Sequence, residues 1–190
     1  MQQLKQAILR DSVILSDSVI TLDAVLNQQV DPALIMEVGR VFAQLYEHDG
    51  VSKVVTIESS GISIAFATAY HLGVPLVFAR RKKTIVSDPN TYTERVPSFT
   101  QGIVSDLWIA HSFLSESDRI LLIDDIIANG DAVRGMIRIV ERSGATLVGL
   151  GIAVEKCFQA GARTIREQGY RLESLAKISS LADGKVTFES

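Results

Sequence analysis

Two adjacent carboxylates, Asp124 and Asp125, stand between an apolar run and a short loop of small residues. The stretch from 121 to 132 reads LLIDDIIANGDA. Carboxylates placed in this way can accept hydrogen bonds from sugar hydroxyls, or hold a metal ion directly or through water. Taken alone, an acid pair after a strand is more often a solvated turn with a helix cap, so the neighbouring residues must decide between the two interpretations.

The loop after the acid pair leads into an amphipathic helix that we expect over residues 131–143. The NH groups and the dipole at a helix N-terminus attract anions, and Gly130 lets the backbone approach one closely. We therefore expect a phosphate group to bind a few residues downstream of the acids.

These residues need a scaffold, and the hydrophobic pattern predicts two β-α-β units. The clearest helix runs from Asp31, which can cap it, to about His48. Near-continuous apolar strands that alternate with helices indicate an α/β fold with a parallel sheet covered on both faces, where ligands bind beyond the carboxyl ends of the strands. The expected strands are 53–57, 75–79, 119–123 and 146–154, the helices between them are 61–72 and 131–143, and 124–130 is a loop.

Two regions lie outside this pattern. The connection over 80–118 is long, and its segments around 97–101 and 105–110 are expected to pair as a flap. The two ends of the chain, residues 1 to about 30 and about 156 to 190, are expected to pack together over the carboxyl edge of the sheet.

Composition limits the class of protein. The length of 190 residues suits one domain. The chain has 19 Lys plus Arg and 22 Asp plus Glu, and the resulting net charge of −3 disfavours nucleic acid as a partner. Cys157 is the single cysteine, so no intrachain disulfide is possible and a cytosolic location is expected. We see no secretory signal, and Gly and Pro interrupt the longest uncharged stretch, so no membrane segment is expected.

The acid-pair stretch resembles the phosphoribosyl pyrophosphate (PRPP) signature of the type I phosphoribosyltransferase family. Further blocks extend the resemblance over nearly the whole chain and point to members that act on xanthine: VILSDSVITLDAVLNQQVDP, VVTIESSGI, GVPLVFARRKK, VPSFT and GIAVEKCFQAGARTIREQGYRLESLAKI. The resemblance implies one domain over 1–190 with the type I phosphoribosyltransferase-like fold, a hood from about 1–30 and 156–190, and a flexible flap over about 83–108.

The activity implied is purine salvage, in which the 5-phosphoribosyl group passes from PRPP to N9 of xanthine and releases pyrophosphate. The resemblance implies Mg²⁺ bound with PRPP rather than held tightly by the protein alone. It also implies a cytoplasmic homodimer that binds these small molecules and neither nucleic acid nor membrane.

Residue roles follow from the same resemblance. Asp124 and Asp125 would contact the ribose hydroxyls. The 5′-phosphate would be wrapped by Ala128, Asn129, Gly130, Asp131 and Ala132. Many family members have Thr and Gly in place of Asn129, Asp131 and Ala132, so we expect backbone NH groups to bind the phosphate and the Asp131 carboxylate to turn away and cap the helix.

The resemblance also indicates which residues contact the pyrophosphate and the purine base. By this resemblance Ser59, Ser60 and Gly61 would face the pyrophosphate, although Ser-Ser-Gly alone is more often an ordinary turn. Arg80 follows an expected strand end and Lys83 lies at the base of the flap, so both are candidate partners for pyrophosphate, although such a basic run is more often a solvated loop. Three residues are expected to contact the base. Without the resemblance, Lys156 would be interpreted as an ordinary surface lysine after a strand. The three residues are Ile20, Asn27 and Lys156.

Several alternatives stay open at this point. Phe158 and Phe78 can stack on a purine or pack in the core, and Trp108 and Tyr92 can shield the site or pack in the flap. A regulator that keeps the fold and senses PRPP or a nucleotide would need a basic surface or an added domain for DNA or RNA. An enzyme of the same fold for adenine, or for hypoxanthine and guanine, is the third possibility.

Overall fold

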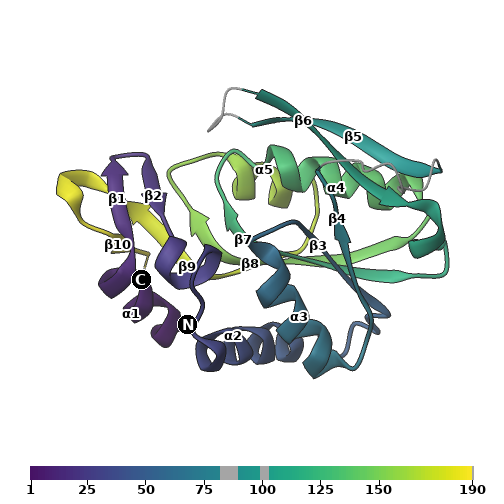
Figure 1. The fold of residues 1–190 in the computed structure, drawn as a ribbon, viewed down its shortest axis with the longest axis horizontal. Coiled ribbons are helices and arrows are strands. Elements are labelled where there is room, and N and C mark those ends of the chain that lie inside the picture. Colours follow the sequence, from purple (N-terminus) through teal and green to yellow (C-terminus); the bar gives the residue numbers. More distant parts are fainter. Residues whose placement is uncertain (82–89, 99–102, 190) are drawn as a thin grey trace.

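A computed structural model describes residues 1–81, 90–98 and 103–189 of the chain. A six-stranded sheet forms its centre, with the order β10-β9-β8-β7-β3-β4 (Figure 1). Neighbouring strands are parallel except β10, which pairs with β9 in the antiparallel sense. The strands are β3 (Lys53–Ile57), β4 (Leu76–Ala79), β7 (Arg119–Ile127), β8 (Thr146–Lys156), β9 (Leu172–Ser180) and β10 (Thr187–Phe188).

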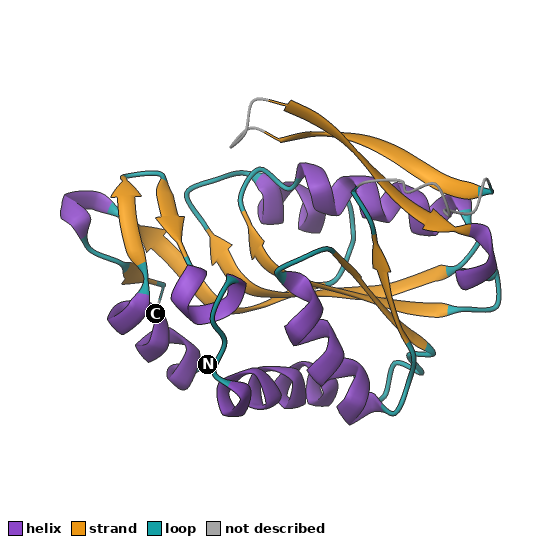
Figure 2. Ribbon diagram, viewed as in Figure 1, coloured by secondary structure: helices purple, strands orange, loops and turns teal. Residues whose placement is uncertain are grey.

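Helices cover both faces of this sheet, as the apolar strands predict (Figure 2). Helices α2 (Pro32–Leu45) and α3 (Gly61–Leu72) lie on one face, and α4 (Asp131–Arg142) and α5 (Gly161–Glu167) lie on the other. Each layer has its own apolar core, one around Phe42 and Ile64 and one around Met136 and Ile165. Burial on both faces explains why the central strands are almost entirely apolar.

The first long helix begins and ends for local reasons. The Asp31 carboxylate accepts hydrogen bonds from the backbone NH groups of Ala33 and Leu34, at 2.9 and 3.4 Å, so it caps α2 as predicted. The helix ends at Leu45 rather than near His48, because residues 46–50 form turns instead of continuing the helical ladder.

The end of one strand differs from the prediction in a way that matters for the site. The expected strand 119–123 continues as β7 to Ile127, with Asp124 opposite Ile152 and Ile126 opposite Val154 on β8. The acid pair therefore belongs to the strand rather than to a loop over 124–130. The prediction was wrong because the long neighbouring strand β8 supplies backbone partners that keep β7 extended through its polar residues.

The flap region contains an antiparallel hairpin of β5 (Thr91–Ser98) and β6 (Ile103–Ala110). Its first strand begins earlier than the expected segment 97–101. At its base, Arg80 and Trp108 exchange two backbone hydrogen bonds of 2.9 and 3.0 Å. Residues 82–89 and 99–102, which include part of the expected flap, lie outside the described residues.

The two chain ends lie side by side (Figure 1). The Met1 ammonium donates to the Leu175 carbonyl at 2.5 Å, and Lys5 Nζ donates to the Glu189 carbonyl at 3.2 Å. However, β9 is a strand of the main sheet, so residues 156–190 are not wholly a separate cap. The remaining elements are α1 (Gln2–Asp11), β1 (Val13–Ser16), β2 (Val19–Thr21), the π-helix η1 (Asp23–Asn27) and the 3₁₀ turns η2 (His111–Phe113) and η3 (Ala182–Gly184).

None of the helices within the described parts of the chain is long and apolar enough to cross a membrane.

Candidate active site

The acid pair lies in the carboxyl half of β7, where little water reaches it. Asp124 and Asp125 are 7% and 8% exposed, and the Asp125 backbone NH donates to Asp124 Oδ1 at 3.1 Å. Burial raises the pKa of Asp124 well above its ordinary value, the charge of Asp125 raises it further, and Arg81 opposes the shift. Burial also raises the pKa of Asp125, while a hydrogen bond with the Ser60 side chain acts to lower it. Two crowded carboxylates of this kind favour a bound cation or hydroxyl donors.

The second predicted loop meets the acid pair directly. Gly61 begins α3, and a β-carbon added to it would lie 3.0 Å from Asp124 Oδ1 and would overlap the Thr56 hydroxyl. The Ser60 side chain forms a hydrogen bond with Asp125, which acts to lower the pKa of that carboxyl group. The structure therefore brings the Ser59-Ser60-Gly61 loop and the acids, which are more than sixty residues apart in sequence, to one edge of the sheet.

The predicted phosphate loop lines a cavity of about 210 Å³ at the start of α4. Gly130 has a φ of +80°, a left-handed conformation that permits the tight turn from β7 into the helix. Backbone NH groups at the start of α4 lie at this cavity, which is the anion-binding arrangement of a helix N-terminus. All five predicted residues, 128–132, line the cavity together with Asp124, Ile126, Ile127, Val133, Arg81, Val96 and Pro97.

Asp131 does not cap the helix, so that expectation was wrong. Gly130 occupies the cap position without a side-chain hydrogen bond, and Asp131 is the first residue of α4. Its carboxylate instead pairs with Arg134, whose Nη2 lies 2.7 Å from Asp131 Oδ1. Residues three apart on a helix lie on one side of it, so Arg134 neutralises the acid beside the expected phosphate.

Arg80 is engaged by an acid that sequence reasoning did not select. Its Nε lies 2.7 Å from Glu58 Oε2, and the Arg81 backbone NH donates to Glu58 Oε1 at 2.5 Å. Arg81 donates from Nη1 to the Ser105 hydroxyl at 2.9 Å and lines the phosphate cavity. Arg81 could have been selected from its place in the basic run, but the sequence alone does not show that Arg81 rather than Arg80 lines the phosphate cavity. Lys83 lies outside the described residues.

The three predicted base residues lie on different elements. Lys156 ends β8 and donates from Nζ to the Ser18 carbonyl at 3.0 Å, and burial lowers the pKa of its ammonium group. Ser18 lies in the turn just before Ile20, which is buried in the hood. The lysine thus reaches from the sheet edge to the β1–β2 hairpin.

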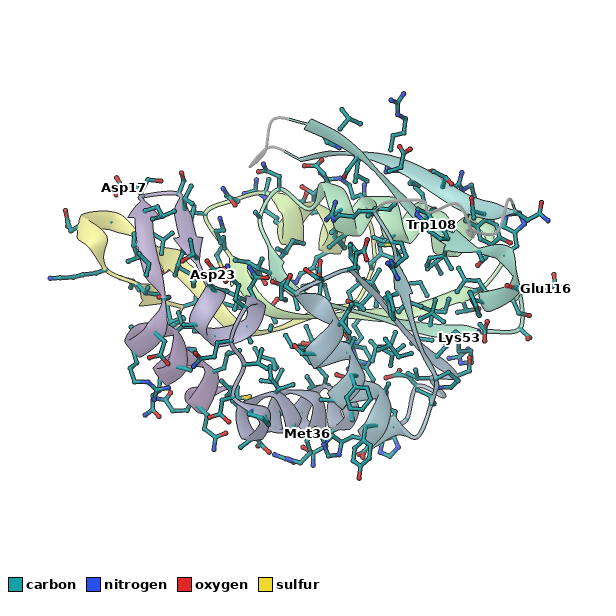
Figure 3. All side chains as sticks on the ribbon, viewed as in Figure 1. Asp17, Asp23, Met36, Lys53, Trp108 and Glu116 are labelled. Carbon is teal, nitrogen blue, oxygen red and sulfur yellow. The ribbon has the colours of Figure 1, made fainter. Side chains whose placement is uncertain are left out.

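Asn27 is oriented by a neighbour that the sequence did not suggest. Its Nδ2 donates to Asp23 Oδ1 at 2.6 Å, four residues earlier in η1 (Figure 3 labels Asp23). A carboxylate only accepts hydrogen bonds, so the amide nitrogen must face Asp23 and the amide oxygen is left for another partner. Asn27 lines a groove of about 570 Å³ that Ser59 and Ser60 also line, which places it next to the second loop.

The aromatic candidates lie in two places. Phe158 follows Lys156 closely and is partly exposed. Phe78 lines a different hollow with Trp108 and Phe113, where its ring centre lies 5.7 Å from the Arg80 guanidinium (Figure 3 labels Trp108). Tyr92 packs against the His111 ring, with the ring centres 4.0 Å apart.

Known proteins resemble this chain over nearly its whole length. The model of the family described as "Phosphoribosyl transferase domain" matches residues 26–178. A xanthine phosphoribosyltransferase of Stutzerimonas stutzeri (strain A1501) is 46% identical over 188 residues, which are 99% of this chain and 99% of that protein. A xanthine phosphoribosyltransferase of Bacillus thuringiensis (strain Al Hakam) is 45% identical over 188 residues, 99% of this chain and 95% of that protein.

Solved structures share the fold at lower identity. An adenine phosphoribosyltransferase from Rhodothermus marinus superposes with a TM-score of 0.74 at 23% identity, covering 93% of this chain and 97% of that one. An APRTase from Giardia lamblia, complexed with 9-deazaadenine, gives a TM-score of 0.76 at 20% identity, covering 92% and 97%. Identities this low carry the fold and leave the substrate to the site residues.

Proposed function

The chain belongs to the phosphoribosyl transferase family, and from this premise we propose that it is a purine salvage enzyme that makes xanthosine 5′-monophosphate (XMP). It transfers the 5-phosphoribosyl group of PRPP to N9 of xanthine and releases pyrophosphate. One observation carries the proposal: a buried acid pair, a helix-start loop and a Ser-Ser-Gly loop meet at the carboxyl edge of a parallel sheet. The xanthine phosphoribosyltransferases of similar length support the choice of base.

Three groups of residues bind the three parts of PRPP. Backbone NH groups of 128–132 bind the 5′-phosphate, and Asp124 and Asp125 accept hydrogen bonds from the ribose hydroxyls. Ser59, Ser60 and Gly61 face the pyrophosphate. The bond from C1′ to pyrophosphate then breaks with oxocarbenium character on the ribose, so the protein needs to position the donor and stabilise the leaving charge rather than supply a nucleophile.

The acid pair fits a magnesium ion that enters with the donor. Mg²⁺ prefers oxygen ligands, and Asp124 and Asp125 offer two carboxylates whose pKa values burial has raised, so a cation would relieve their repulsion. A carboxylate pair leaves most of the coordination positions of Mg²⁺ unfilled, so oxygens of PRPP and water would complete the coordination. When bound, the ion neutralises charge on the pyrophosphate and the ribose oxygens.

Lys156 supports xanthine over purines with fewer oxo groups. Xanthine carries an additional 2-oxo group and loses a proton more readily than hypoxanthine, so an ammonium group near its oxygens and N7 favours it. Ile20 supplies an apolar surface, and Asn27 supplies both a donor and an acceptor. The flap over about 83–108 would exclude water, which otherwise hydrolyses the donor.

The direct test follows pyrophosphate release with PRPP, Mg²⁺ and each purine in turn. We expect release with xanthine. Faster pyrophosphate release with adenine than with xanthine would refute the role of Lys156. Faster release with hypoxanthine or guanine would show that the enzyme acts on another base. No release with any base would refute the enzyme and favour a regulator that senses PRPP.

The double variant Asp124→Asn, Asp125→Asn tests the site within the same assay. We expect a loss of at least about a hundredfold in turnover with the fold retained, since both charged groups that contact the ribose are removed. Near-normal turnover in this variant would contradict the site assignment even if the wild-type protein uses xanthine.

We further propose that the protein is a cytoplasmic homodimer that needs no nucleic acid or membrane. The net charge of −3 and the single cysteine support the location and the lack of a nucleic-acid partner. The exposed side chains of Phe66 and Tyr70 on α3 support the dimer.

A further inference from the structure

The start of α5 lies directly against the phosphate loop. The Gly161 backbone NH donates to the Ala128 carbonyl at 3.1 Å. A β-carbon added to Gly161 would lie 2.7 Å from both Asn129 C and Gly130 N, and it would overlap the Ala128 carbonyl oxygen. These are backbone atoms, which cannot rotate away as a side chain can, so any side chain at 161 must displace the loop.

The contact is close from both sides. A β-carbon added to Gly130 would lie 3.1 Å from Gly161 Cα, and its φ of +80° already disfavours a side chain there. Two glycines thus face each other across the boundary between the loop and α5. Because the loop curves around the expected 5′-phosphate, its support by Gly161 determines where its NH groups point.

An ion pair between the buried Glu155 and the half-buried Arg166 holds α5 to the sheet. Arg166 donates from Nη1 and Nη2 to the two carboxylate oxygens of Glu155 at 2.9 and 2.7 Å, and from Nε to the Leu172 carbonyl at 3.2 Å. Glu155 is 5% exposed and also accepts a hydrogen bond of 2.5 Å from the Ser174 hydroxyl. Such a two-point pair fixes both the distance and the orientation of the helix.

Glu155 immediately precedes Lys156 on β8, so the same pair anchors the residue assigned to the base. The segment from 156 to 161 therefore connects the base lysine at one end with the support of the phosphate loop at the other. We propose that Gly161 is a positioning residue for the 5′-phosphate loop, and that Arg166 is a positioning residue that holds α5 in place for it. The inference deepens the proposed function and rests on it.

The physical reason lies in the geometry of the transfer. N9 of the base and C1′ of the ribose must lie in line at near-contact distance, and an error of about 1 Å costs up to about a hundredfold in rate. The 5′-phosphate and the base are held by different segments of chain. A rigid connection through α5 keeps the distance between these two segments constant.

Gly161→Ala is the direct test, read by calorimetric binding as well as by turnover. We expect the affinities for PRPP and for XMP, which both carry a 5′-phosphate, to fall by about tenfold or more. The affinity for pyrophosphate with Mg²⁺, which binds at Ser59-Ser60-Gly61, should stay within about twofold of the wild-type value. The KM for PRPP should rise with the loss of affinity.

Two arginines of α5 provide a matched pair. Arg166→Lys keeps the charge but loses the two-point contact with Glu155. It should weaken PRPP and XMP binding in the same pattern as Gly161→Ala, to a smaller extent. Arg163 pairs with Glu167 on the exposed side of the same helix, so Arg163→Ala should bind all three ligands as the wild type does.

Two results would overturn the inference. One is a folded Gly161→Ala protein that binds PRPP and XMP with wild-type affinity, and the other is an equal loss for pyrophosphate, which would indicate general disruption. If Gly161→Ala does not fold, Arg166→Lys decides by the same criterion, and wild-type binding in it refutes the inference. Failure of the wild type to use xanthine would refute the proposed function and not this inference. The inference would still be tested, because PRPP binding can be compared between the wild type and the variants.

Discussion

Asp124 shows how a residue suited to the reaction reduces the stability of the fold. Its carboxylate is almost fully buried beside a second carboxylate, and no cation of the described residues pairs with it at salt-bridge distance. Burial therefore raises its pKa, with the charge of Asp125 as a further cause. A group whose pKa is higher in the folded than in the unfolded protein stabilises the fold at low pH, and this contribution is lost as pH rises through the folded pKa.

Asp124→Asn should consequently raise the melting temperature at neutral pH while it lowers turnover. The difference from the wild type should be small near the ordinary pKa of an Asp and should grow as pH rises, because only the wild type must bury the charge. Thermal unfolding of both proteins from about pH 4 to about pH 8 measures it. A lower melting temperature of the variant at neutral pH would contradict the prediction.

Asp118 provides a control of opposite sign. Burial acts to raise its pKa, but the Lys53 ammonium at 2.7 Å, the Ser115 backbone NH at 2.8 Å and the Ser52 hydroxyl at 3.1 Å outweigh it, so the pKa is lowered (Figure 3 labels Lys53). A lowered folded pKa gives stability that is present above the unfolded pKa and lost as pH falls. Asp118→Asn should therefore destabilise the protein at neutral pH, with a smaller effect in acid.

At the scale of elements, α4 links the phosphate loop to the hairpin of β5 and β6. Its first turn forms one wall of the phosphate cavity, and the hairpin packs along its outer side. Glu94 of β5 lies 2.9 Å from Arg138 Nε and 3.3 Å from Arg142 Nη2, so one acid bridges two successive turns of the helix. Gly135 on α4 lies against Val96, and a β-carbon there would overlap Val96 Cγ1.

Gly135→Ala should displace the hairpin from α4 and open the phosphate cavity, which Val96 also lines. We expect a loss of about 1–3 kcal/mol in the free energy of unfolding and a lower kcat, with more PRPP hydrolysed in the absence of a purine. Chemical denaturation and an assay for pyrophosphate release without xanthine measure the two effects.

Val96→Ala offers a rescue in the same background, because it removes Cγ1, the methyl group that the new side chain would overlap. Gly135→Ala, Val96→Ala should recover part of the stability and most of the coupling between purine binding and pyrophosphate release. No recovery would mean that the defect arises within α4 itself rather than at the hairpin contact.

At the scale of the whole molecule, one exposed surface remains unexplained by the site. Phe66 and Tyr70 lie one turn apart on α3 and are 60% and 67% exposed. Exposed aromatic side chains are enriched at protein interfaces, so under the proposed homodimer we expect these two to contact a second copy of the chain. Phe66 also lines the groove that Asn27 and Ser60 share, so this interface would border the site.

Phe66→Ser, Tyr70→Ser should convert the dimer to a monomer or raise its dissociation constant by at least about tenfold. Light scattering after size-exclusion chromatography, over a dilution series, gives the mass. Phe113→Ser serves as the control, since Phe113 is 57% exposed but lies on η2, away from α3. A monomeric wild type would refute the homodimer, and an unchanged dimer in the double variant would place the interface elsewhere.

The sequence by itself determined the alternation of strands and helices, the cap of α2 by Asp31, and the edge of the sheet at which we expect a ligand to bind. It also singled out the acid pair and the loop over 128–132. Such features depend on hydrophobic periodicity, turn residues and helix starts, which involve neighbours within one or two turns of the chain.

Tertiary structure alone decided how these residues are held. β7 runs through the acids because β8 lies beside it, and Asp131 pairs with Arg134 rather than capping α4. Glu58 engages Arg80, and Gly161 supports a loop more than thirty residues earlier in the chain. No periodicity marks such contacts, because they depend on which segments pack side by side once both faces of the sheet are buried.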